Sequence, residues 1–288
     1  MTGTGTQADP YICDTWAELI SVSTSKDTYI QMSGSGSKII DFNGIQPLGF
    51  DSQVNLSGQI DFNGWTFKNF YSKNLRAVYI LNGSSWDNLT FDNFYQEVAT
   101  SASGNVGFLY ADSNSYAVKI TNCKFYGKVS YGAYSTSSAI VFYSSNARTM
   151  QFEQCAFSLE CSCTSGKFAI FRMGFIRDCN IKFDVKSVTA NIVALHNASE
   201  LYIFNSLITG KINVSDTTGT ILSGASLSGY NVFSVQTNVP MVYAGAGVSV
   251  FDNNLSPVTV STDNFVGCTP SELKSASHLY SVGFPCYR

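Results

Sequence analysis

Short runs of alternating apolar and polar residues recur along the chain, separated by clusters of Gly, Asn, Ser and Asp. The apolar members are mostly β-branched or aromatic, which is typical of strands with one buried face. No run carries a heptad or a helical stripe, so we expect an all-β fold. The strand-like runs lie at 77–81, 106–111, 139–144, 168–172 and 191–195.

A six-residue pattern also repeats: apolar, any residue, Gly or small polar, apolar or small, any residue, apolar. Successive copies of the pattern start at least 24 residues apart. Such spacing is typical of the coils of a solenoid, in which the extra residues of a longer coil form a loop on one side. We therefore predict a right-handed parallel β-helix with coils of roughly 24 residues. The copies are 24, 34, 32, 24, 27 and 24 residues apart and begin at Phe62, Trp86, Ile120, Phe152, Ile176, Ile203 and Leu227.

The third position of the pattern predicts a turn ladder. Gly and Asn tolerate a left-handed backbone at least cost, and stacked amides can hydrogen-bond along the axis. The fourth position predicts an interior stack. Alternatively, the Gly and Asn residues at the third position are ordinary turn residues of a sandwich or barrel. That alternative does not explain why they recur at the same position of each repeat. The ladder comprises Gly64, Asn88, Asn122, Gln154, Asp178, Asn205 and Gly229; the stack comprises Trp65, Leu89, Cys123, Cys155 and Cys179, followed by Ser206 and Tyr230.

One structural domain is expected, because a solenoid grows along its axis without a second core. We divide it into an entry segment with a capping helix at 1–37, the β-helix at 38–260 and a C-terminal cap at 261–288. Thr15-Trp-Ala-Glu18 and Thr269-Pro-Ser-Glu272 have capping-box spacing, so each end is predicted to carry a short helix that covers the exposed cross-section.

Composition narrows the class of partner. Charged residues make up 13% of the chain, against a usual share of about 25%. The net charge of −3 and pI near 5.3 leave no basic footprint, so no nucleic-acid partner is expected. The sequence has no apolar stretch of about 18 residues, the length that a transmembrane helix needs, so we expect no membrane partner. The first ten residues do not resemble a secretory signal.

Eight cysteines raise the question of disulfides. Three occupy the interior stack, where cysteine behaves as a small hydrophobe, so free thiols are expected. Cys268 and Cys286 flank the C-terminal segment and are the pair that could form a disulfide in an oxidising compartment. Cys161-Ser-Cys163 lacks zinc-ligand spacing and the chain has two histidines, so we predict no metal and no cofactor.

Catalytic chemistry finds little support. Many β-helices degrade polysaccharides with two carboxylates about 5–9.5 Å apart, and Glu153 with Asp178 is the best such pair. A ladder role for Asp178 and an ion pair between Glu153 and Arg177 explain them equally well. No polygalacturonase, pectate-lyase or Gly-x-Ser-x-Gly motif is present, and His196 lies in an apolar run. The sequence does not decide whether the protein is an enzyme, but it favours a protein without enzymatic activity.

Tyrosines offer a binding surface instead. Tyr71 and Tyr95 end two copies of the repeat and should stack on one flank, while Tyr131 and Tyr134 lie in an extended connection. Aromatic rings beside Asn, Ser and Asp suit sugars, which offer apolar faces and hydroxyl edges. These four tyrosines are the candidate glycan-binding residues. The alternative is that they pack in the core.

The ends of the chain resemble a known family. "GTGTQADPYICDTWAELISV", "YIQM", "KIIDFN" and "IDFNGWTFKNFY" resemble the opening of β-helical virion proteins, of the tail-fibre, head-fibre or tail-spike type, from tailed bacteriophages and prophages of gut Gram-positive bacteria. "TPSELKSASHLYSVGFP" resembles the terminator that follows such β-helices. The likeness covers roughly the first 75 and last 25 residues, and the middle matches only as a generic β-helix.

The resemblance implies localisation on the virion, assembly with other virion proteins, and a bacterial cell-surface polysaccharide as partner. A homotrimer is one assembly it implies, although no heptad segment enforces three-fold association. Three functions follow: a non-enzymatic appendage that attaches to host glycans, a depolymerising tail spike, or a purely structural element of the particle.

Overall fold

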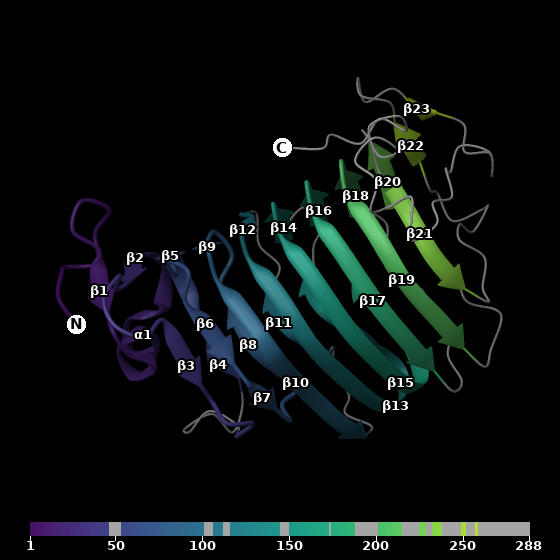
Figure 1. Cartoon of the computed structure of the whole chain (residues 1–288), viewed down its shortest axis with the longest axis horizontal. Helices are drawn as coiled ribbons and strands as arrows, with labels where there is room; N and C mark the ends of the chain where they lie inside the picture. Colours follow the sequence, from purple (N-terminus) through teal and green to yellow (C-terminus); the bar gives the residue numbers. More distant parts are fainter. Residues whose placement is uncertain are drawn as a thin grey trace.

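The computed structural model is an all-β chain built on two long parallel sheets (Figure 1). It describes residues 1–45, 53–100, 106–111, 116–144, 150–172, 174–187, 201–214, 225–228, 232–237, 249–251 and 257–258. Backbone alone is described at 100, 133–138, 165–167, 187, 201 and 214 and in the four stretches from 225 onward. The predicted cap at 261–288, together with Gly229, Tyr230, His196, Cys268 and Cys286, lies outside these residues.

The first sheet has eleven strands within the described residues and runs the length of the molecule. Neighbouring strands are parallel, except for the antiparallel last pair. In spatial order they are β1 (Tyr11–Cys13), β2 (Thr24–Met32), β5 (Ser57–Asp61), β9 (Ser85–Asp87), β12 (Val118–Thr121), β14 (Met150–Glu153), β16 (Gly174–Arg177), β18 (Leu201–Phe204), β20 (Ala225–Ser228), β22 (Ser249–Phe251) and β23 (Pro257–Val258).

The second sheet is also parallel and carries a branch. Its main path is β3 (Ile39–Asp41), β6 (Thr66–Lys68), β10 (Thr90–Thr100), β13 (Lys124–Ser144), β15 (Ala156–Phe171), β17 (Asn180–Ser187), β19 (Leu207–Val214) and β21 (Val232–Thr237). The other strands are β7 (Tyr71–Ser72), which pairs with β10, and the row β4 (Val54–Asn55), β8 (Arg76–Ile80) and β11 (Gly107–Ala111), which joins β13.

A strand of the first sheet leads through a tight turn into a strand of the second, and the chain then returns to the first sheet one position farther along the axis. This arrangement is compatible with a β-helix. The turns use left-handed backbone at the predicted ladder positions. Asn88, Asn122, Gln154, Asp178 and Asn205 have φ between 45° and 60°, and Gly64 has φ of 78°.

Backbone hydrogen bonds hold this column together. The N–H of Asn88 donates to the Thr121 carbonyl of the next coil at 3.1 Å, and the N–H of Asn122 donates to that of Glu153 at 3.1 Å. The Asn122 amide donates to Asp87 Oδ1 at 2.8 Å. The Asn122 side chain thus bonds to Asp87, the residue before Asn88. The sequence predicts instead that the side-chain amides of successive turn residues bond to each other.

The first two repeat copies need a correction. The sequence places Phe62 opposite Trp86, but the structure pairs Ile60 with Trp86 and, after the turn, Phe67 with Phe91. The earlier turn is therefore two residues longer. Asn63 and Gly64 both have positive φ, of 51° and 78°, and absorb the extra length without disturbing the strands on either side.

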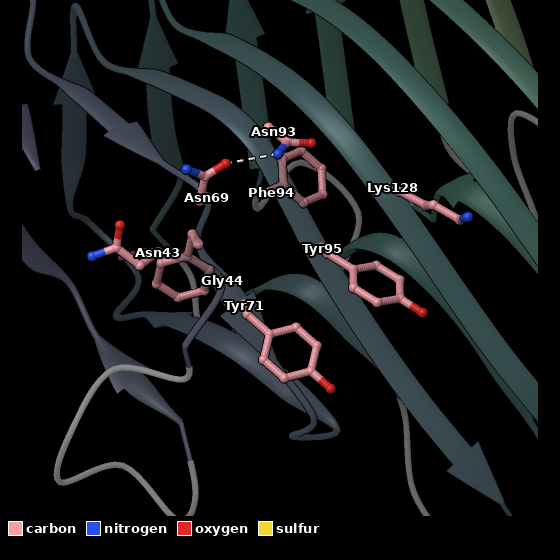
Figure 2. Close-up of a pocket in the computed structure, with 9 residues that line it drawn as sticks. Asn43, Gly44, Asn69, Tyr71, Asn93, Phe94, Tyr95 and Lys128 are labelled. Atoms are coloured by element: carbon pink, nitrogen blue, oxygen red, sulfur yellow. Dashed lines mark hydrogen bonds between the residues drawn. The ribbon is translucent and has the colours of Figure 1, made fainter. Parts of the chain in front are cut away.

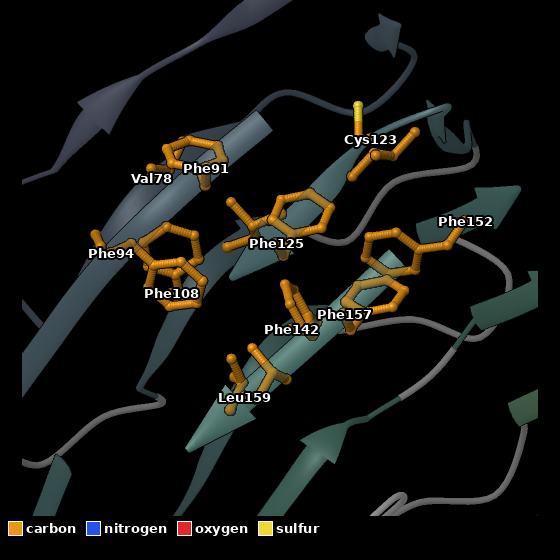
Figure 3. Close-up of a cluster of buried hydrophobic side chains, with 14 of the residues drawn as sticks. Val78, Phe91, Phe94, Phe108, Cys123, Phe125, Phe142, Phe152, Phe157 and Leu159 are labelled. Atoms are coloured by element: carbon orange, nitrogen blue, oxygen red, sulfur yellow. The ribbon is translucent and has the colours of Figure 1, made fainter. Parts of the chain in front are cut away.

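The core between the sheets is a stack of aromatic rings (Figure 3). Phe91, Phe125 and Phe157 occupy paired positions of β10, β13 and β15. Their centroids are 5.8 Å and 5.3 Å apart, and the rings are nearly parallel. Because parallel strands in register place like residues above like residues about 4.8 Å apart, one ring per coil generates this column.

The interior stack lies beside these rings. Trp65, Leu89, Cys123, Cys155 and Cys179 are at most 4% exposed. Within the described residues the six cysteines are all free thiols. Burial raises the pKa of Cys123 from its ordinary 9.0 to about 12, because the thiolate would lose its hydration.

Cys123 is therefore expected to resist alkylation in the native chain. At pH 8 its thiolate population should be roughly a thousandfold lower than for a thiol of ordinary pKa. Peptide mass spectrometry after iodoacetamide treatment, with and without guanidinium, measures this. Above about pH 9 the Cys123 thiol ionises in the unfolded chain but stays protonated in the folded one. The contribution of Cys123 to the free energy of unfolding is therefore constant below about pH 9 and falls as the pH rises above it. Native labelling of Cys123 at the unfolded rate would contradict this burial.

One helix, α1 (Trp16–Val22), precedes the first long strand. Thr15 Oγ1 accepts a hydrogen bond from the Glu18 N–H at 3.2 Å, and Glu18 Oε2 accepts one from the Asp14 N–H at 2.8 Å. The Trp16 ring packs edge-on against Phe67, 5.4 Å away, so α1 contacts the interior at this end of the sheets. No helix among the described residues is long and apolar enough to cross a membrane.

Candidate functional site

A second row of left-handed asparagines lies at the outer turn of the second sheet. Asn43, Asn69 and Asn93 follow β3, β6 and the start of β10 and have φ of 54°, 53° and 57°. The sequence analysis missed this row. The signal was present, because the repeated "NFY" at 69–71 and 93–95 contains two of the three asparagines.

Side-chain hydrogen bonds connect this row. Asn93 Nδ2 donates to Asn69 Oδ1 at 2.7 Å, and Asn69 Nδ2 donates to Asp41 Oδ1 at 2.8 Å. The Asn43 N–H also donates to Asp41 Oδ1, and this backbone bond, followed by the Asn69 amide, lowers the pKa of the Asp41 carboxyl. The Asn69 amide is held at both ends, while Asn93 Oδ1 at the end of the row makes no bond in the described residues.

The row ends where the next strand straightens. Asp92 pairs with Tyr126 and Phe94 pairs with Gly127, so Asn93 is an extra residue without a partner in β13. An added Cβ at Gly127 would lie 2.4 Å from the Phe94 carbonyl oxygen and 2.5 Å from the Phe94 ring, so the glycine makes room for both. β13 has no residue that corresponds to Asn93, so it continues straight where β10 carries the extra residue. A strand that bends thus lies beside one that does not.

Two tyrosines flank the asparagine row. Tyr71 and Tyr95 are paired residues of β7 and β10, and their rings stack with centroids 5.6 Å apart. Both are half-buried. Lys73 Nζ lies 5.9 Å from the Tyr71 ring, and Lys128 Nζ lies 5.9 Å from the Tyr95 ring. Tyr71 is oriented by its hydroxyl, which donates to Glu97 Oε2 at 3.2 Å, and burial raises the pKa of Tyr95.

These groups line one hollow of about 830 Å³ (Figure 2). Amides lie along one side of it and phenol rings along the other, with Lys128 beside Tyr95. The size lies within the usual range for a small-molecule site, about 300–1,000 Å³. The lining residues are Asn43, Gly44, Asn69, Phe70, Tyr71, Asn93, Phe94, Tyr95 and Lys128. The structure thus brings together Tyr71 and Tyr95 from the predicted set.

Tyr131 does not belong to this surface, which corrects the sequence prediction. It is 1% exposed, and its hydroxyl donates to Gln96 Oε1 at 2.7 Å inside the fold. Gln96 is itself fully buried and donates to the Asn74 carbonyl at 2.8 Å. Tyr131 is therefore a hydrogen-bonded core residue. Tyr134 lies in β13, but its side chain is outside the described residues.

The carboxylates considered for catalysis lie on the first sheet and the turn that follows it. Glu153 pairs in register with Arg177, and its Oε1 lies 3.9 Å from a guanidinium nitrogen. Asp178 has φ of 53°, and its N–H donates to the Phe204 carbonyl at 3.0 Å. Glu153 thus lies near a cation, and the Asp178 backbone takes part in the turn column. No group of three His, Cys, Asp or Glu suited to a metal ion occurs among the described residues.

Comparison with known proteins gives little information about this chain. No known protein family matches the chain, and no curated protein matches it. Among solved structures, it is similar to a candidate immunoglobulin A1 protease from Bacteroides ovatus, with 16% identity and a TM-score of 0.47, over 90% of this chain and 82% of that one. A likeness at this level supports no conclusion about function.

Proposed function

We propose that this chain is a non-enzymatic appendage of a tailed-phage particle that attaches to glycans on the host surface. The observation that carries the proposal is the hollow in which the stacked rings of Tyr71 and Tyr95 lie beside the Asn43–Asn69–Asn93 row. The resemblance of both chain ends to β-helical virion proteins supplies the biological setting. It also supports localisation on the virion and contacts with other virion proteins.

The chemistry of the hollow suits a sugar. A pyranose ring has an apolar face that packs on phenol rings and hydroxyl groups that pair with amides. Asn43 and Oδ1 of Asn93 offer hydrogen bonds that no other residue in the described part of the chain uses. Because the Asn69 amide is fixed at both ends and Tyr71 is held by Glu97, little side-chain ordering remains to oppose binding.

The architecture supports the same proposal. We infer a right-handed parallel β-helix with coils of roughly 24 residues and a short cap at each end, since parallel crossovers are almost always right-handed. The contacts of Trp16 and Leu19 with the interior favour a capping role for α1. A capped rod with repeated outer faces suits an exposed particle protein. Light scattering on the purified chain tests whether it forms the homotrimer that the resemblance implies.

Binding is favoured over depolymerisation because the best carboxylate pair has structural partners. Glu153 lies near Arg177, and the Asp178 backbone continues the turn column. Release of new reducing ends or unsaturated sugars from host polysaccharide by the purified chain would favour the tail-spike alternative. Absence of affinity for any host, with the chain present on particles, would favour the structural one.

Changing Tyr71 and Tyr95 together to alanine is expected to weaken adhesion to host cells by roughly fivefold to 150-fold, since each ring contributes about 0.5–1.5 kcal/mol. Binding of the labelled chain to a panel of gut Gram-positive isolates measures the effect. Tyr116→Ala is the matched control, because that ring is 65% exposed and does not line the hollow. Unchanged adhesion of the double variant, with its fold intact by circular dichroism, would remove the site from the proposal.

A further inference from the structure

A second hollow adjoins the first along the same sheet. It has a volume of about 320 Å³ and is lined by Asp92, Asn93, Tyr126, Gly127, Lys128, Ser158 and Glu160. Asn93 and Lys128 line both hollows. The two therefore form one continuous surface across β7, β10, β13 and β15, a span of three strand spacings or about 14 Å. A monosaccharide fills only part of such a surface, whereas a chain of sugars extends over it.

Charged side chains of both signs lie along this surface. Lys128 is exposed at the junction, with its ammonium group beside Tyr95, while Asp92 and Glu160 lie in the second hollow. Register places Glu160 next to Lys128 on the neighbouring strand. Even so, none of the ion pairs in the described part of the chain involves Lys128, Asp92 or Glu160. A cation and two carboxylates thus remain available to a ligand.

We infer that the two hollows bind a linear polysaccharide of mixed charge, in a site that rests on the proposed function. An anionic group of the chain, carboxylate or phosphate, pairs with Lys128 where the hollows meet. A neighbouring amino sugar places its ammonium group between Asp92 and Glu160. Uncharged faces of the sugars pack against Tyr71 and Tyr95. Charge-assisted hydrogen bonds are about twice as strong as neutral ones, so the charge pattern selects among polymers of similar shape.

The test uses one polysaccharide in four forms. A chain of alternating glucuronic acid and N-acetylglucosamine carries carboxylates only, and N-deacetylation adds amines. Carboxyl reduction of each form removes the carboxylates. Calorimetry at low salt is expected to rank the form with both charges first, about tenfold tighter than either singly charged form. The preference should shrink at 0.5 M salt, because exposed charges are then screened.

Two substitutions assign the charges. Lys128→Met is expected to abolish the advantage of carboxylated over carboxyl-reduced chains while keeping the preference for amines. Glu160→Gln is expected to reduce the preference for amines and keep that for carboxylates. Lys124→Met and Glu153→Gln are matched controls, because both residues are exposed and lie outside the hollows. Neither should change the ranking.

The outcomes separate this inference from the function on which it rests. Equal affinity for the four forms, or no binding of any form, overturns the inference. If adhesion to host cells still depends on Tyr71 and Tyr95, the proposed function stands without the charge selectivity. If the unaltered chain binds neither host cells nor the four polymers, both fail. A Lys128→Met variant that keeps the full carboxylate preference assigns the anion to a different site and overturns this one.

Discussion

Replacing Phe91 by alanine is expected to lower the free energy of unfolding by about 3–5 kcal/mol. The side chain is fully buried on β10. Removing it costs the transfer free energy of the ring and leaves a cavity that the six neighbouring rings cannot collapse to fill. Its centroid lies 5.2–6.4 Å from the rings of Phe67, Phe70, Trp86, Phe94, Phe108 and Phe125.

Denaturant unfolding followed by circular dichroism measures the loss, provided that the dependence on denaturant is unchanged. Tyr116→Ala removes an aromatic ring that is 65% exposed and should change the unfolding free energy by about 0.5 kcal/mol or less. A cost below about 1 kcal/mol for Phe91→Ala would mean that the rings do not form a continuous core.

Replacing Gly174 by alanine is expected to destabilise the chain by about 2–5 kcal/mol, through backbone strain of about 1–2 kcal/mol and overpacking of about 1–3 kcal/mol. Gly174 opens β16 with φ of 147°, and an added Cβ would lie 2.0 Å from the Met150 carbonyl oxygen of the neighbouring strand. The backbone oxygen takes part in the sheet and cannot move away without breaking its register.

Gly36→Ala separates the two contributions. Gly36 has φ of 78°, and no atom lies within 4 Å of an added Cβ, so only the conformational cost of about 1–2 kcal/mol should appear. Thermal and denaturant unfolding of both variants measure the difference. Equal costs at the two positions would show that the strand pairing around Gly174 is looser than the structure describes.

The turn chemistry was readable from the sequence because it is local. The turn between the two sheets needs a left-handed residue each time it recurs, and few residue types tolerate this backbone, so Asn88 and Asn122 could be identified by type and spacing. Even Gln154, a poor match by type, has φ of 54°. The stacking of Tyr71 on Tyr95 was readable for the same reason, since one repeat separates them.

The buried position of Tyr131 differs from the sequence prediction. The sequence Tyr-Gly-Ala-Tyr predicts an extended connection, but β13 continues through it as a single strand of 21 residues. Alternation from Phe125 through Val129 places Tyr131 on the interior face, where it is 1% exposed. That periodicity was present in the sequence. The buried Gln96 that accepts its hydrogen bond lies 35 residues away and could not be inferred from local pattern.

The sequence by itself determined the repetition: the turn residues between the two sheets, such as Asn88 and Asn122, the buried positions of Cys123 and Cys155, and the parallel stacking of the strands. It could do so because neighbouring coils in register demand like residues at like positions. Only the tertiary structure decided the two-residue shift at Asn63-Gly64, the loss of the asparagine turn after Asn93, and the hollows joined at Lys128. These depend on which coils bend and which stay straight, and that is set by contacts between residues distant in sequence.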